Sequence, residues 1–333
     1  MPQLRAVVVL VVLCMFLTSV AVEGATPKTY LGVSGISFDY TPFWYAKDYG
    51  LYQKYNVDVD IITTSGGTVL AQAMLSGGAH FAAIGTAFLQ GSMQGADHVI
   101  LAAHVNYFPY RLVGLPSVAG KDGLKDATIA ISRFGSNADV ALRLALKQAG
   151  LDPAKDVTIV QLGTQPERLA ALNTRRVQAT LMSPPFSSAA KKTGLKVVLD
   201  ISKMRIAYPQ IGLVSSRDYL AKNRANARGF VQAYLEAIRD LKKNKEATVK
   251  LLSKYLRMDL ENNRDILVDT YDENIASDEL EKKPYPNRDG MKLAVELIAK
   301  QRNISPIPNI ENFMDTSLLA ELDRSGFIDQ LYR

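Results

Sequence analysis

The sequence predicts an α/β protein with two lobes, and three observations lead to this prediction. First, strand-like segments alternate with segments of helical periodicity between residues 30 and 201, which is typical of largely parallel sheets. Second, this alternation stops at a loop over 116–123 and then starts again. Third, the chain of 333 residues is longer than one hydrophobic core usually supports.

The first half is clearest in the stretch 61–86, IITTSGGTVLAQAMLSGGAHFAAIGT. A β-branched strand end precedes the turn Ser65-Gly66-Gly67-Thr68, a helix with one apolar face, a second glycine turn and a strand at 81–84. The turn would present N–H groups and a helix N-terminus at the carboxyl end of a strand, where open α/β sheets bind ligands. The glycines could equally serve only to make a tight turn. Around this stretch we expect strands at 30–36, 57–64 and 99–105, and an aromatic-rich helix at 43–55.

The second half repeats this pattern with a strand at 128–132, the turn Phe134-Gly135-Ser136-Asn137 and a helix at 138–149. Ser136 and Asp139 have the spacing of a capping box. Further strands are expected at 157–162, 177–182 and 196–201, and Pro166 fits the start of a helix that ends near residue 175. Because both halves place a Ser- and Gly-bearing turn after a strand, we expect the two turns to face each other across a cleft.

From about residue 217 the sequence becomes helical, with segments at 217–243, 246–256, 260–275 and 288–301. This block is too helical to form a third sheet. We therefore expect it to pack against one lobe, to which a strand at 211–215 returns the chain.

Residues 1–25 have the layout of a secretory signal peptide: Arg5, an apolar run over 6–22 and then small residues. An uncleaved anchor is the weaker alternative, because about 17 apolar residues are marginal for a membrane span. Cleavage would remove Cys14, the single cysteine, and leave no thiol, disulfide or cysteine ligand. Such a protein suits the periplasm or the cell exterior.

Charge and histidine content argue against several other classes of protein. The net charge of +6 is dispersed in small lysine clusters, which favours solvated helix faces over a nucleic-acid site. Three histidines, His80, His98 and His104, leave little room for a zinc site. We expect a monomer with no metal and no cofactor.

Four segments carry a resemblance to a known family: YTPFWYAKDYGLY at 40–52, the glycine turn and helix at 65–77, LKDATIAI at 124–131, and 163–179 with its RLAAL sequence. Over roughly 28–256 the chain resembles the substrate-binding proteins of bacterial ABC importers. Within these it is most similar to the nitrate/sulfonate/taurine and thiamine-precursor group, called NMT1/THI5-like or SsuA-like.

This resemblance implies a type II periplasmic-binding-protein fold, in which two lobes are joined by two crossovers and close on a ligand. The crossovers would lie near 112–115 and 208–212. Lobe 1 would then comprise 26–112 and lobe 2 113–210, while 211–333 would return to lobe 1 and add the helical segment packed on it. The implied partners are a small-molecule ligand, such as a sulfonate, carboxylate, nitrate or pyrimidine-like heterocycle, and the permease and ATPase subunits of an ABC importer.

We expect ligand-binding residues at the strand ends and turns of both lobes, with aromatic side chains beside them. They are Phe38, Asp39, Tyr40, Ser65, Gly66, Gly67, Thr68, Thr86, Ser132, Phe134, Gly135, Ser136, Asn137, Ser183 and Tyr208.

Asp39 departs from the pattern of the nitrate and sulfonate binders, which tend to have small or neutral residues after the first strand. A carboxylate in the cleft would repel an anion unless Arg111 or Arg133 neutralised it, and it would favour a ligand with an amine, a ring N–H or a hydroxyl. Asp39 could equally cap the following helix.

The leading interpretation is a non-enzymatic carrier that closes on a small solute and presents it to a permease. A sensory module that feeds a receptor would have the same fold and the same export signal. A third alternative is an enzyme resembling the THI5-like pyrimidine synthases, which use a histidine- and cysteine-rich iron site. The absence of cysteine from the exported chain argues against that alternative.

Overall fold

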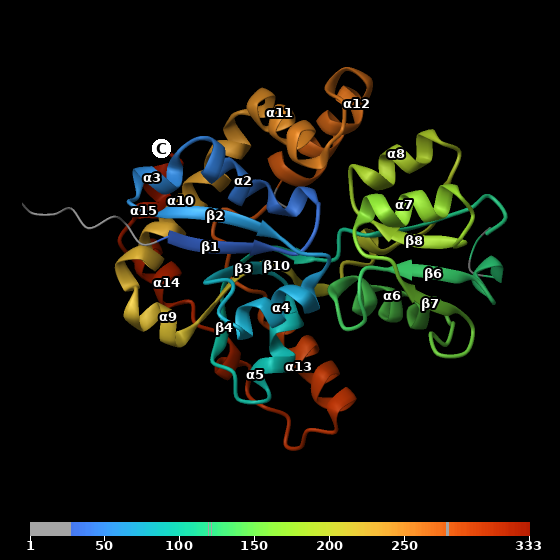
Figure 1. Ribbon diagram of the computed structural model, residues 1–333, viewed down its shortest axis with the longest axis horizontal. Helices are drawn as coiled ribbons and strands as arrows, with labels where there is room; N and C mark the ends of the chain where they lie inside the picture. The colour runs from blue at the N-terminus through green and yellow to red at the C-terminus, as the bar shows by residue number, and fades with distance from the viewer. Residues whose placement is uncertain (1–27, 119, 121, 278–279) are drawn as a thin grey trace, which may run out of the picture.

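The computed structural model describes residues 28–118, 120, 122–277 and 280–333, so the expected signal peptide lies outside the described residues. Within this part of the chain, two five-stranded sheets lie side by side, one in each lobe (Figure 1). The prediction of an α/β protein with two lobes is confirmed. Lobe 1 is the name used for the first sheet with its helices, and lobe 2 is the name used for the second sheet with its helices.

The sheet of lobe 1 has the strand order β2-β1-β3-β10-β4. Strand β1 (Lys28–Val33) lies parallel to both β2 (Asp58–Thr63) and β3 (Phe81–Ile84). Strand β10 (Ala207–Ser216) pairs antiparallel with β3 and with the edge strand β4 (His98–Tyr107). Every residue of β3 is buried, as expected for a strand covered on both faces.

Short helices connect these strands. The helix expected at 43–55 is in fact two helices, α2 (Thr41–Asp48) and α3 (Leu51–Lys54), because Gly50 between them adopts a left-handed φ of 71°. Helix α4 (Gly67–Leu75) begins in the predicted glycine turn. The remaining short elements are the 3₁₀ turns η1 (Phe38–Tyr40) and η2 (Thr86–Phe88) and the helix α5 (Leu89–Ser92).

The sheet of lobe 2 has the order β7-β6-β8-β5-β9. Its strands are β5 (Arg111–Gly114), β6 (Thr128–Ile131), β7 (Thr158–Gln161), β8 (Ala179–Met182) and β9 (Lys196–Asp200). Its helical elements are η3 (Asp122–Leu124), α6 (Asn137–Gln148), α7 (Gln165–Asn173), α8 (Phe186–Lys192) and η4 (Ile201–Met204). Ser136 caps α6 as predicted, because its side chain accepts a hydrogen bond from the backbone N–H of Asp139.

The chain crosses between the lobes at residues 108–110 and returns over 201–206. The crossovers expected at 112–115 and 208–212 are therefore placed wrongly, since these segments lie largely inside β5 and β10. Arg111 and Leu112 pair with strands of lobe 2, and Ala207 pairs with β4 of lobe 1. The expected lobe boundaries after 112 and 210 are each a few residues too late for the same reason. The segment at which the resemblance implies the first crossover forms β5, which lies between β8 and β9 in the second sheet.

The C-terminal part is helical and mostly covers lobe 1, as predicted (Figure 1). Its elements are α9 (Arg217–Lys222), α10 (Arg224–Lys243), α11 (Lys245–Leu256), α12 (Leu260–Tyr271), the π-helical turn η5 (Asp272–Ala276), α13 (Arg288–Arg302), η6 (Ile310–Phe313), α14 (Ser317–Arg324) and α15 (Phe327–Leu331). The helix expected at 217–243 breaks at Asn223, and the one expected at 260–275 ends as η5.

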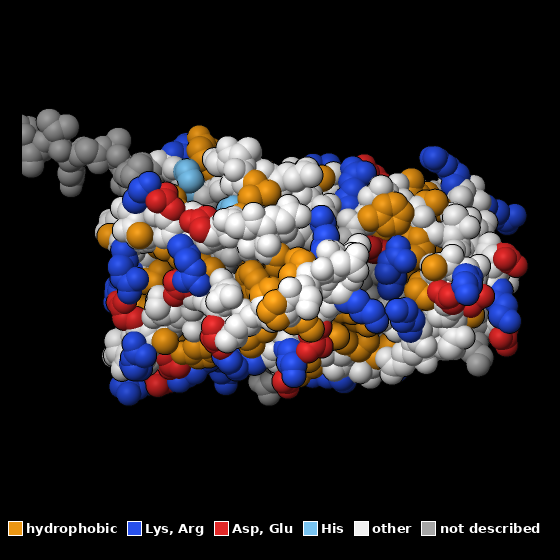
Figure 2. Space-filling view, turned by 90° about the horizontal axis from the view of Figure 1, so that it is seen from below, with side chains coloured by type: hydrophobic (Ala, Val, Ile, Leu, Met, Phe, Trp, Pro, Cys, Tyr) orange, Lys and Arg blue, Asp and Glu red, His pale blue; other side chains and the backbone are white. Residues whose placement is uncertain are grey.

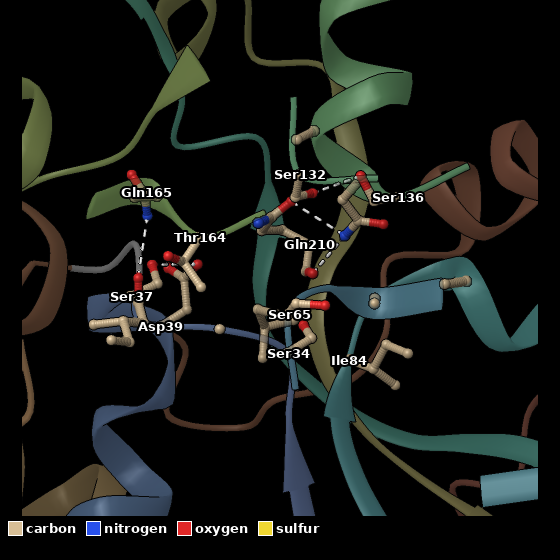
Figure 3. Close-up of a pocket in the computed structure, with 18 of the residues that line it drawn as sticks. Ser34, Ser37, Asp39, Ser65, Ile84, Ser132, Ser136, Thr164, Gln165 and Gln210 are labelled. Atoms are coloured by element: carbon tan, nitrogen blue, oxygen red, sulfur yellow. Dashed lines mark hydrogen bonds between the residues drawn. The ribbon is translucent and has the colours of Figure 1, made fainter. Parts of the chain in front are cut away.

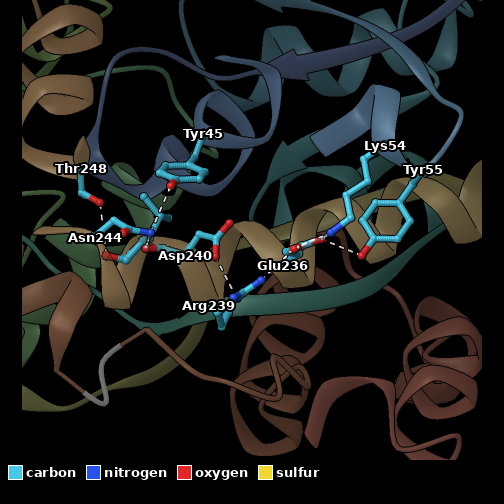
Figure 4. Close-up of polar contacts among 9 residues, drawn as sticks. Tyr45, Lys54, Tyr55, Glu236, Arg239, Asp240, Asn244 and Thr248 are labelled. Atoms are coloured by element: carbon cyan, nitrogen blue, oxygen red, sulfur yellow. Dashed lines mark hydrogen bonds and ion pairs between the residues drawn. The ribbon is translucent and has the colours of Figure 1, made fainter. Parts of the chain in front are cut away.

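Helix α10 attaches this block to lobe 1 by apolar and polar contacts. Phe230 stacks on Phe81 of β3 with ring centroids 4.2 Å apart. Glu236, which is 5 % exposed, accepts hydrogen bonds from Lys54 Nζ and the Tyr55 hydroxyl, each at 2.7 Å (Figure 4). Since Arg239 also reaches this carboxylate at 2.7 Å, the buried charge is well compensated.

The described helices include none that is long and apolar enough to cross a membrane. On the face seen in Figure 2, Lys and Arg side chains are interspersed with Asp and Glu. This face carries no extended patch of one sign.

Candidate ligand-binding cleft

A polar cavity lies between the two lobes and measures about 590 Å³ including its open mouth (Figure 3). The loops after β1, β2 and β3 form one wall, and the N-terminal ends of α6 and α7 form the other. The lining includes hydroxyl groups from both lobes: Ser34, Ser37, Tyr40, Ser65, Tyr110, Ser132, Ser136 and Thr164. The cavity is thus placed where open α/β sheets bind ligands.

Three helices begin at this cavity. Ser136 and Thr164 are the N-caps of α6 and α7, and Gly67 is the first residue of α4. All three residues line the cavity. The positive ends of the three helix dipoles therefore favour an acceptor or anionic group in the cavity.

Direct hydrogen bonds hold the two lobes together around the cavity. Arg133 Nη2 of lobe 2 donates to Ser65 Oγ of lobe 1 at 3.0 Å, and the hydroxyls of Ser37 and Ser183 are 3.2 Å apart. Gln165 Nε2 lies 3.4 Å from the carbonyl oxygen of Ile36. The two lobes are accordingly in direct contact around the cavity.

Asn137, the first residue of α6, makes the most extensive of these contacts. Its Oδ1 is 3.4 Å from both the backbone N and the hydroxyl of Thr86, and its Nδ2 donates to the carbonyl oxygen of Gln210 at 2.5 Å. The fit is tight, because a Cβ on Gly85 would lie 1.9 Å from Nδ2 of Asn137.

Arg168, on α7, is a buried cation in the cavity lining, only 2 % exposed. Nε donates to Thr180 Oγ1 at 3.1 Å, Nη2 to the carbonyl oxygen of Leu181 at 3.0 Å, and Nη1 to that of Gly163. Burial lowers the pKa of Arg168 to about 10, so the guanidinium remains charged at neutral pH. Its hydrogen-bond partners are neutral oxygens, so its charge has no carboxylate in contact among the residues that the structure describes.

Asp39, in η1, is 3 % exposed and also lines the cavity. Its Oδ2 accepts a hydrogen bond from Ser37 Oγ at 3.1 Å, whereas Oδ1 has no partner within the described chain. Burial raises the pKa of Asp39 to about 7, although Ser37 and, to a lesser degree, Gln210 favour the ionised form. Asp39 therefore titrates near neutral pH.

The structure bears on two points that the sequence left open for Asp39. Asp39 does not cap α2, whose N-terminus has no side-chain cap. Neither arginine neutralises it, since Arg111 lies 3.8 Å from Asp200 and 3.5 Å from Glu273, and Arg133 donates to Ser65.

His104 is fully buried on β4 behind Asp39. Its Nε2 lies 2.7 Å from the carbonyl oxygen of Asp39, and its Nδ1 lies 2.8 Å from the Tyr234 hydroxyl. Burial lowers the pKa of His104 to about 4, so the ring is neutral at pH 7. His104 thus supports η1 without adding a positive charge beside Asp39.

Asp39 and His104 should affect the pH dependence of stability in opposite directions. Between about pH 4 and 6.5 the unfolded chain protonates His104 and the folded one does not, so this group makes stability rise with pH. Between about pH 3.8 and 7 the folded chain retains a proton on Asp39 that the unfolded chain releases, so Asp39 makes stability fall as pH rises.

The variant Asp39→Asn removes only the second effect. We expect its free energy of unfolding, relative to wild type, to increase with pH by up to about 1.4 kcal/mol per pH unit between about pH 4.5 and 6.5. Urea unfolding of both proteins measures this difference. A difference that stays constant over this range would mean that Asp39 is ionised throughout.

The structure brings about half of the predicted site residues to the cavity. Those in its lining are Asp39, Tyr40, Ser65, Gly67, Ser132, Ser136 and Asn137. Outside the lining are Phe38, Gly66, Thr68, Thr86, Phe134, Gly135, Ser183 and Tyr208. Ligand contact stays a prediction for the first group.

Several residues outside the lining have another position or partner. Thr86 and Tyr208 are buried and share a hydrogen bond of 2.6 Å. Phe134 is 47 % exposed, and Phe38 lines a separate hollow beside the first crossover. Ser183 is bound to Ser37 and to Gln165.

Sequence reasoning missed several polar residues of the lining: Ser34, Ser37, Tyr110, Thr164, Gln165, Arg168 and Gln210. Two signals were present. Thr164 precedes a helix start just as Ser136 does, and Arg168 lies near the start of the predicted helix, directly before the apolar run at 169–172. Tyr110 comes from the first crossover and Gln210 from β10, and the positions of both depend on the complete topology.

Comparison with solved structures identifies the fold as that of type II periplasmic binding proteins. The aliphatic sulphonate-binding protein SsuA of Escherichia coli superposes with a TM-score of 0.66 and 19% identity, over 88% of this chain and 99% of that chain. The nitrate-binding protein NrtA of Synechocystis PCC 6803 superposes with a TM-score of 0.72 and 17% identity, over 91% of this chain and 89% of that chain.

The sequence comparisons define the family more closely. The NMT1-like family model matches residues 24–254, and the chain belongs to this family. YtlA of Bacillus subtilis, which carries the name of a binding protein, is 23% identical over 296 residues, covering 87% of this chain and 81% of YtlA. The family resemblance in the sequence is thereby confirmed.

Proposed function

We propose that the protein is an exported solute-binding protein that closes its two lobes around a small polar molecule and delivers it to an ABC importer. The observation that carries the proposal is the interlobe cavity, whose polar groups come from both lobes. A solute that contacts both walls would stabilise the closed arrangement and exclude water from its hydrogen bonds. The family membership and the sulphonate- and nitrate-binding proteins of similar fold support this proposal.

Export through a cleaved N-terminal signal and residence in the periplasm are parts of the same proposal, based on the pattern of residues 1–25. The same proposal includes that the protein is a carrier without enzymatic activity. The cavity groups in Figure 3 are suited to hydrogen bonding, and the buried histidine next to Asp39 has both ring nitrogens in contact with internal partners. Among the described residues no group of His, Cys, Asp and Glu could hold a metal ion.

Binding is tested by thermal unfolding of the purified protein with nitrate, alkanesulfonates, carboxylates, amino acids and pyrimidines. A solute that binds only the folded state raises the melting temperature. Small-angle scattering should show a smaller radius of gyration with the same solute, because the lobes close. If no member of the panel raises the melting temperature, the carrier function loses its support.

A sensory module would behave identically in these two measurements. The neighbouring genes separate the two functions: permease and ATPase genes support import, and a sensor kinase gene without them contradicts it.

A further inference from the structure

The unpartnered oxygen of Asp39 is the feature of the cavity that best indicates what kind of solute it holds. Oδ1 is buried in the lining and accepts no hydrogen bond from any described residue. A buried carboxylate oxygen without a donor is costly. A donor supplied by the solute would remove this cost.

None of the described side chains around Asp39 donates to Oδ1. The Gln210 amide, which favours the ionised form of Asp39, donates to the Tyr110 hydroxyl at 2.7 Å. The titratable and charged side chains around it come from four elements: Tyr40 from η1, His104 from β4, Tyr110 from the first crossover and Arg168 from α7. Each is directed to another partner: Tyr40 to Ser34, His104 to the Asp39 carbonyl, Tyr110 to Gln210, and Arg168 to Gly163, Thr180 and Leu181.

The charges of the cavity lining indicate which second group the solute carries besides a donor. Asp39 and Arg168 are the only charged side chains among the described lining residues, so the lining is neutral overall when Asp39 is ionised. Arg168 and the three helix N-termini favour an acceptor or acid group, whereas Asp39 favours a donor. A solute with net charge zero that carries both groups leaves neither charge uncompensated.

We propose that the solute is net-neutral and combines an N–H donor, directed at Oδ1 of Asp39, with an acid group or a neutral acceptor held by lobe 2. Amino acids, aminosulfonates and aminopyrimidines have this chemistry, whereas nitrate and simple alkanesulfonates lack the donor. The inference rests on the proposed function and specifies the substrate class of the same cleft.

Matched probes that differ only in the nitrogen test the proposal. The pairs are 2-aminoethanesulfonate with ethanesulfonate, alanine with propionate, and 4-aminopyrimidine with pyrimidine, each titrated calorimetrically into the wild-type protein at about pH 8. In at least one pair, the nitrogen-bearing member should bind 30-fold or more tightly than its partner.

The pH dependence of affinity has opposite signs for the two classes of solute. A solute whose N–H group donates to Asp39 requires the ionised carboxylate. The dissociation constant of such a solute should therefore rise by up to about tenfold per pH unit below pH 7. An anion requires protonated Asp39 and should bind more tightly as the pH falls. Because this measurement uses the wild-type protein, it stands even if a variant fails to fold.

In Asp39→Asn, affinity for the nitrogen-bearing probe should fall at least tenfold and its dependence on pH should disappear. Asp289→Asn, at an exposed position on α13, is the matched control and should bind as wild type does. The inference would be overturned if the anionic members of the pairs bound best and bound more tightly at low pH or to Asp39→Asn. The solute-binding function would then remain. If no probe or panel member binds, both fail.

Discussion

Arg168→Met is expected to lower the free energy of unfolding by about 3 to 5 kcal/mol. The substitution keeps much of the side-chain volume but removes the donors bound to Thr180 and to the carbonyl oxygens of Gly163 and Leu181. Buried acceptors left without donors cost about 1 to 3 kcal/mol each. The substitution also removes the desolvation cost of the buried guanidinium, which is seen in the lowered pKa of Arg168, and this offsets part of that loss.

Urea unfolding measures this effect, with Arg176→Met as the control because Arg176 is exposed just beyond the same helix. The control should stay within about 0.5 kcal/mol of wild type. Arg168→Lys retains the charge but cannot reproduce the fork of donors, and should lie between the two. An Arg168→Met protein within about 1 kcal/mol of wild type would show that the carbonyl oxygens find other partners.

The sequence was sufficient to predict the fold because its local patterns are strong. The strand at 81–84 matches β3 residue for residue, and the Ser136 cap forms as the spacing indicates. The crossovers were misplaced because nothing local separates β5 from a linker. Its place depends on pairing with β8 and β9, whose residues lie about 70 to 90 positions further along the chain.

The site was predictable only in part for a related reason. The turns after strands, with Ser65 and Ser136, carry a local signal and do line the cavity. Arg168 and Gln210 reach the cavity from the inside of a helix and from a long strand, so their positions depend on how α7 and β10 pack. Tyr208 sits on the same strand but is buried behind Thr86. A residue beside a predicted strand end can thus face the core as readily as the cleft.

Asn137→Ala should weaken solute binding by about 10- to 100-fold while changing the stability of the separate lobes little. Asn137 joins lobe 2 to Thr86 and Gln210 of lobe 1, and separation of the lobes would break these hydrogen bonds. Each is worth about 0.5 to 1.5 kcal/mol, so their loss shifts the equilibrium toward open lobes. A closed-state binder loses apparent affinity in proportion to that shift.

Calorimetric titration with the matched probe that binds wild type most tightly measures the effect. Asn173→Ala, at the exposed end of α7, is the control and should bind normally. Asn137→Asp keeps the acceptor for Thr86 but turns a carboxylate oxygen toward the Gln210 carbonyl, so it should bind more weakly still. Unchanged affinity in both Asn137 variants would mean that the solute itself, and not the contact between lobes, determines closure.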